Sequence, residues 1–125
     1  MQQSKVNSKH GEMVKLLTKS GEEILQTTTP AKAHLMHMCF GVCDEAGELI
    51  GAVKKHLIYG KELDYDNVIE ELGDLEFYLE GLRSKIQIIP EECLTHNIEK
   101  LGVRYKGYKY TDKAAQERAD KKENK

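Results

Sequence analysis

The chain has 125 residues, of which 39% are hydrophobic, 32% charged and only 6% aromatic. Its 19 basic and 21 acidic side chains give a net charge of −2. This near balance argues against a nucleic acid polymer as partner, because proteins that bind one carry a strong basic excess. No apolar run reaches the roughly 18 residues of a membrane span, and no secretory signal follows Met1, so we expect a cytoplasmic protein with no membrane partner.

The length suits one domain with a modest core, part of which a second subunit can complete. Three cysteines without a CxxC pair are expected to be reduced thiols. We assign residues 1–28 to an N-terminal arm. Its first ten residues are polar and expected to be mobile, a short helix is predicted near 11–19, and a further turn near 22–26.

The first long helix is predicted from Pro30 to about Ile58, with Thr29 as its cap. At about 100° per residue, seven apolar side chains fall in one sector of this helix: Leu35, Met38, Val42, Ala46, Leu49, Val53 and Leu57. A stripe of polar and small residues, which includes His37, Glu45, Glu48 and Lys55, lies beside that sector.

A second helix is predicted at about 67–86, after a loop at 60–65 and capped by Asp64 or Asp66. Pro90 begins a third helix at about 90–101, which Gly102 is expected to end. A loop at 104–110, a last helix at about 112–120 and a frayed tail at 121–125 follow. No segment alternates as a strand does, so the predicted fold is all-α: a helical hairpin with flanking helices, in a domain spanning 29–120.

Four carboxylates stand out on the predicted hairpin. Glu45 and Glu48 are three residues apart, as are Glu71 and Asp74 on the next helix. This spacing places each pair on one helix face, and an antiparallel hairpin brings the pairs opposite each other. Converging carboxylates need protons or cations, and an all-oxygen ligand set suits Mg²⁺, or Mn²⁺.

The simpler alternative is that these acids are solvated helix faces. Two pairs at matching spacing argue against it, as do Gly47 and Gly73 beside them. A glycine inside a helix costs about 1 kcal/mol relative to alanine, so two of them next to the acids suggest close helix approach or room for a ligand. Mg²⁺ held by carboxylates usually keeps positions for substrate phosphates, so triphosphate chemistry is the natural prediction.

The motifs resemble those of the MazG-like all-α nucleoside triphosphate pyrophosphohydrolases, in particular their short phage and bacterial members. The resemblance covers about residues 30–120 and rests on 43–49, on 68–78, and on 97–105 with Ala114 and Arg118. It departs from the family at Asp44, where the family often has Glu.

The resemblance implies Mg²⁺-dependent hydrolysis of (deoxy)nucleoside triphosphates to monophosphate and pyrophosphate, for cleansing or rebalancing the nucleotide pool. It places Glu45, Glu48, Glu71 and Asp74 at the catalytic and metal-ligand positions. It also implies a homodimer or homotetramer built around a four-helix bundle, in the cytoplasm of a bacterial or phage-infected cell.

Eight further residues are candidates for binding substrate. On the hairpin, side chains on the acidic faces can line the base end or meet phosphates: His37, Lys55, Tyr78 and Lys85. Downstream, the resemblance favours a substrate role for Asn97, Lys100 and Arg104, which are otherwise a solvated basic face. Tyr105 can stack on a base or donate a hydrogen bond, and its simpler alternative is packing.

Two other functions stay open. The same site can act on an alarmone such as (p)ppGpp, or the chain can be a non-catalytic helical dimer that binds nucleotide or metal. Converging carboxylates count against the second, because a scaffold has no need of them.

Overall fold

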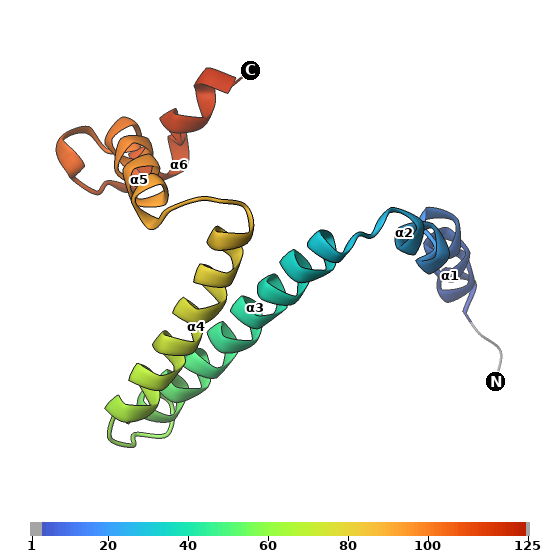
Figure 1. Ribbon diagram of the computed structural model, residues 1–125, viewed down its shortest axis with the longest axis horizontal. Helices are drawn as coiled ribbons and strands as arrows, with labels where there is room; N and C mark the ends of the chain where they lie inside the picture. The colour runs from blue at the N-terminus through green and yellow to red at the C-terminus, as the bar shows by residue number, and fades with distance from the viewer. Residues whose placement is uncertain (1–3, 125) are drawn as a thin grey trace. The chain divides into compact units, whose positions relative to one another are not determined.

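The computed structural model of the protein describes residues 4–124 (Figure 1). Over these residues the chain is helical and contains no strand, which confirms the all-α prediction. The chain forms two compact units, Met1–His34 and Leu35–Lys125.

The first unit contains α1 (Lys5–Leu17) and α2 (Gly21–Thr27). α1 begins at Lys5, six residues before the start of the short helix predicted near 11–19, and residues 1–3 lie outside the described part. Ser4 explains the early start, because its Oγ accepts a hydrogen bond from the N–H of Asn7 at 3.2 Å and caps α1. A capping box of Ser20 and Glu23 likewise begins α2.

The second unit is dominated by the antiparallel pair α3 (Pro30–Leu57) and α4 (Tyr65–Lys85), which confirms the predicted hairpin. Pro30 is the first residue of α3, as expected. Asp64, one of the two predicted caps, begins α4 by accepting a hydrogen bond from the N–H of Asn67 at 3.1 Å. The helix therefore starts two residues before the predicted position.

Two glycines let the helices of the hairpin approach closely. A β-carbon on Gly41 of α3 would overlap the ring of Tyr78 on α4, and one on Gly81 of α4 would overlap the Met38 sulfur on α3. Met38, at 7% exposed, and Ala52, at 5%, are the buried hydrophobic residues of the described chain. These pairings set a register in which Glu45 of α3 lies near Asp74 of α4.

The C-terminal part contains α5 (Pro90–Arg104), the 3₁₀ helix η1 (Lys106–Tyr108), α6 (Asp112–Glu117) and the 3₁₀ helix η2 (Ala119–Asn124). The prediction that Gly102 ends the third helix is wrong. Gly102 instead leaves room for Tyr108, whose hydroxyl would lie 3.1 Å from a β-carbon there.

The last two predicted segments also differ from the structure. α6 is shorter than expected, because Arg118 adopts a left-handed conformation (φ 47°) that ends it. The tail expected to be frayed begins as part of η2.

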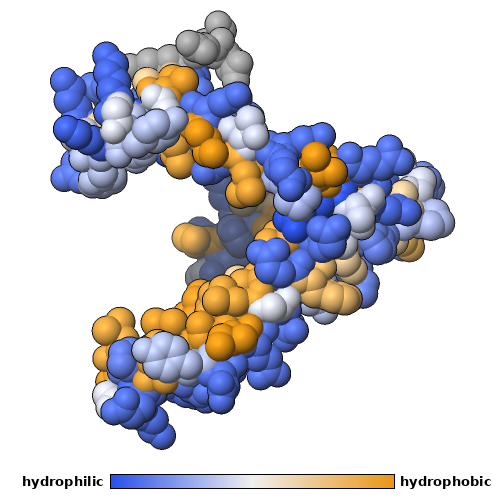
Figure 2. All heavy atoms as spheres, turned by 60° about the vertical axis from the view of Figure 1, so that its left-hand side comes forward, coloured by the Kyte–Doolittle hydropathy of each residue, from blue (hydrophilic) through white to orange (hydrophobic). Residues whose placement is uncertain are grey.

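Many large apolar side chains are exposed, and Figure 2 shows them gathered in patches. On α3 an apolar groove of about 400 Å³ is lined by Leu49, Ile50, Val53, Lys54, Leu57 and Ile58. A hairpin of two helices cannot cover both of its apolar faces, so this exposure indicates an interface. None of the described helices has the length and apolar character needed to cross a membrane.

Candidate metal centre

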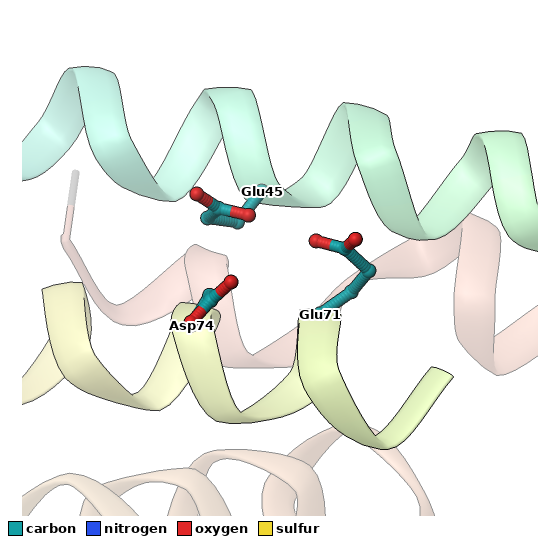
Figure 3. A group of neighbouring side chains, drawn as sticks. All are labelled: Glu45, Glu71 and Asp74. Carbon is teal, nitrogen blue, oxygen red and sulfur yellow. The ribbon is translucent and has the colours of Figure 1, made fainter. Parts of the chain in front are cut away.

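Three carboxylates converge between the two long helices. Glu45 of α3, Glu71 and Asp74 of α4 each offer an oxygen, and these oxygens lie within 4.8 Å of one another. Figure 3 shows Glu45 on one helix and the other two side chains on the helix facing it. We call these three residues the acidic cluster.

Helix geometry explains why two members of the acidic cluster come from α4. Residues three apart on a helix lie on the same face, so Glu71 and Asp74 project together toward α3. The close approach of the helices at Gly41 and Gly81 then brings Glu45 to that face. Glu45 and Glu71 are partly buried, whereas Asp74 is exposed.

The negative charges of the acidic cluster are not balanced by any basic side chain within it. Partial burial, a hydrogen bond with Glu71 and the charges of Asp74, Glu71 and Asp44 together raise the pKa of Glu45 to about 7. A carboxyl group with this pKa holds a proton in about half of the molecules at pH 7 where a cation is absent. A bound cation would relieve the same repulsion.

The donor set fits a hard divalent ion. All three donors are carboxylate oxygens, which Mg²⁺ and Mn²⁺ prefer, and no thiol or imidazole takes part. Mg²⁺ binds oxygen at about 2.0–2.1 Å in an octahedral arrangement, so neighbouring ligands of one ion lie roughly 2.9 Å apart and opposite ligands roughly 4.2 Å apart.

The fourth predicted ligand lies outside the acidic cluster. Glu48 is one turn beyond Glu45 on α3, and its side chain is exposed. The sequence therefore predicted the converging faces, and three of the four carboxylates are together in the structure. A ligand role for Glu48 stays a prediction.

Two predicted substrate residues line one pocket next to the acidic cluster. His37 and Tyr78 belong to a cavity of about 590 Å³ that also contains Phe40, Gly41, Cys43 and Asp44. Sequence reasoning missed Phe40 and Asp44 as part of this site. Helical periodicity could have predicted Asp44 as part of the site, because it places Asp44 on the same side of α3 as His37 and Gly41.

The two lysines predicted to meet phosphate lie at opposite ends of the hairpin. Lys55 is in the last turn of α3, near the connecting loop, and Lys85 ends α4 at the other end. Both side chains are exposed. The structure does not bring them together, and their roles stay predictions.

Arg104, a predicted phosphate ligand, is paired within the C-terminal part. Its Nε donates to Oδ1 of Asp120 at 2.6 Å and its Nη2 to Oδ2 at 2.9 Å. The Asp120 side chain is only 2% exposed, and Arg104 lowers the pKa of that carboxyl to about 2. In this structure the pair therefore joins α5 to η2. No sequence signal revealed it, because the residues are 16 positions apart.

The other downstream candidates lie on α5 or directly after it. Lys100 and Asp120 line a cavity of about 200 Å³, Asn97 is exposed on α5, and the ring centroids of Tyr105 and Tyr110 are 5.8 Å apart. Their substrate roles stay predictions.

No known protein family, curated protein or solved structure matches this chain. The resemblance to MazG-like enzymes therefore rests on the motif residues alone.

Proposed function

We propose that the protein is a Mg²⁺-dependent nucleoside triphosphate pyrophosphohydrolase that acts on (deoxy)nucleotides. The observation that carries the proposal is the convergence of three carboxylate oxygens from α3 and α4 within 4.8 Å. These three acids belong to the two motifs that resemble the MazG-like signature. The raised pKa of Glu45, caused first by partial burial, then by the hydrogen bond with Glu71 and the nearby negative charges, adds support, because a cation would favour the charged form of this carboxyl.

In the proposed reaction, acidic residues of the hairpin have two roles: they hold the metal ion and they accept a proton from the attacking water. Water attacks the α-phosphorus, the bond from that phosphorus to the α–β bridging oxygen breaks, and pyrophosphate leaves. Glu45, Glu71 and Asp74 would hold Mg²⁺, which when bound supplies positive charge against the triphosphate. Glu48 lies outside the acidic cluster, so its carboxylate can accept the proton of the attacking water.

We further propose that the active form is a homodimer or homotetramer. The exposed groove on α3 and the small core support this, because pairing with a second hairpin would complete a four-helix bundle. Such pairing also covers apolar surface that a monomer leaves in water.

The direct test is hydrolysis of a panel of NTPs and dNTPs with Mg²⁺ or Mn²⁺, separated by ion-exchange chromatography. Monophosphate and pyrophosphate should appear in equal amounts, and Glu48→Gln and Asp74→Asn should each abolish most of the turnover. Glu70→Gln is the matched control, because Glu70 is exposed, lies outside the acidic cluster and bears the same charge.

Two results would refute the proposal: no turnover of any triphosphate, or unchanged turnover in both acid variants. Turnover of (p)ppGpp alone would assign the alarmone activity instead. Metal-dependent nucleotide binding without product would assign a non-catalytic binding protein.

A further inference from the structure

The cavity beside the acidic cluster has walls suited to a flat aromatic ligand. Its volume is about 590 Å³, and three of its six lining residues have aromatic rings: His37, Phe40 and Tyr78. All six come from the hairpin, so the cavity is built within one unit of the chain. We call it the aromatic pocket.

The rings are held at fixed angles to one another. Tyr78 packs edge-on against His37, with centroids 6.3 Å apart, and against Phe77, with centroids 5.1 Å apart. Gly41 makes this possible, because any larger residue would displace the Tyr78 ring from α3. His37, Tyr78 and the exposed Phe40 therefore offer ring surfaces in the pocket, against which a nucleobase can stack.

One charged group lies in the wall of the aromatic pocket. Asp44 directly precedes Glu45 of the acidic cluster, and Tyr78 follows Asp74 by four residues, about one helical turn. A nucleotide whose phosphates meet the acidic cluster would thus place its base near Asp44. An ionised carboxylate only accepts hydrogen bonds, so it selects a base edge that donates them.

We propose that the aromatic pocket binds guanine, with the two Asp44 oxygens accepting hydrogen bonds from the N1–H and the 2-amino group. This inference rests on the proposed function for its choice of a nucleotide as ligand. Guanine is the standard base whose pairing edge offers two adjacent N–H donors. Adenine and cytosine place a ring-nitrogen acceptor beside the amino group, and uracil and thymine flank one N–H with two carbonyls, so each would set an acceptor against the carboxylate.

The test compares guanosine with inosine, which differs only by lacking the 2-amino group. Binding of each nucleoside to the full chain in EDTA is measured by NMR titration, with the chemical shifts of the His37 and Tyr78 ring protons as reporters. Guanosine should bind about tenfold more tightly than inosine, the effect of one hydrogen bond to a charged group. Asp44→Asn should bring the ratio close to one, because the amide replaces one acceptor with a donor.

Glu62→Gln is the matched control, since it removes the same charge from an exposed residue in the loop between α3 and α4. Equal affinity for guanosine and inosine in the native chain would overturn the inference, as would an unchanged ratio in Asp44→Asn. Because these measurements use neither metal nor triphosphate, they are independent of hydrolysis. Hydrolysis without guanine preference would refute only the pocket assignment, and guanine preference without hydrolysis would refute only the proposed enzyme.

Discussion

Tyr78 of α4 lies against Gly41 of α3 so closely that a single methyl group at position 41 would overlap its ring. The contact fixes the register of the hairpin directly beside the acidic cluster. The contact between Tyr78 and Gly41 therefore helps to hold Glu45 opposite Glu71 and Asp74.

Gly41→Ala should therefore destabilise the protein. Overpacking at a close helix contact typically costs about 1–3 kcal/mol, so we expect the free energy of unfolding to fall by this amount. Urea titrations of the variant and the native chain would measure the difference. Gly51→Ala is the control on the same helix, because a β-carbon there meets no atom within 4 Å. That change should be neutral or stabilise by up to about 1 kcal/mol through helix propensity. Equal effects of the two substitutions would contradict the close contact.

The acidic cluster predicts an unusual pH dependence of stability in EDTA. The pKa of Glu45 is about 7 in the folded chain and near 4.5 when unfolded. The folded chain holds this proton more tightly, so the contribution of Glu45 is full below pH 4.5 and is lost as the pH rises to about 7. Mg²⁺ should restore stability at the upper end.

Glu45→Gln isolates this effect, because its amide does not titrate. The difference in free energy of unfolding between the native chain and this variant should fall between pH 4.5 and 7, as followed by urea titrations. A flat difference over that range would show that Glu45 titrates normally.

Metal binding should depend on each member of the acidic cluster. Asp74→Asn removes one of three charged ligands, so we expect Mn²⁺ affinity to fall on the order of tenfold or more, measured by calorimetry. Glu70→Gln should bind Mn²⁺ as the native chain does. Equal affinities of both variants would mean that Mn²⁺ binds elsewhere.

Substitutions at the Arg104–Asp120 pair can distinguish a structural role of Arg104 from a phosphate-binding role. Asp120→Asn should lower the urea midpoint, because it leaves a mostly buried guanidinium without its anion. Glu117→Gln is the control, since its contact with Lys113 is exposed and 3.9 Å long. If Arg104→Lys instead raises KM for nucleotide and leaves the midpoint unchanged, the residue binds substrate.

Self-association should depend on the apolar groove of α3. Ile50→Glu with Leu57→Glu places charges on two side chains that are 68% and 74% exposed, so the folded monomer should persist. Sedimentation velocity should show the native chain as an oligomer and the variant as a monomer. Leu16→Glu, at an exposed position of α1, should leave the oligomer intact. A monomeric native chain would refute the proposed assembly.

The long helices and the shared face of Glu71 and Asp74 were predictable, because both follow from periodicity along a single helix. Pro30 and Asp64 mark helix starts through local chemistry that the sequence displays directly. The three-residue spacing of Glu71 and Asp74 is enough to place both on one face of α4, whatever the rest of the chain does.

Features that depend on partners distant in sequence were not predictable. Gly102 looked like a helix stop, and only its contact with Tyr108 shows why a small residue stands there. Asp120 gave no sign that it neutralises Arg104, and the aromatic pocket needed the register between α3 and α4. Glu48 has the right periodicity yet stays outside the cluster, and periodicity along α3 alone does not distinguish it from Glu45.

The acidic cluster draws all of its oxygens from two consecutive helices joined by a short loop. Closing so short a loop costs little entropy, so these ligands can meet early in folding, before distant contacts form. The contacts within the hairpin join residues that are close in sequence, so all members of the cluster belong to one continuous segment of the chain. The acidic cluster can therefore be transferred to another protein with one continuous stretch of sequence, without the remaining helices.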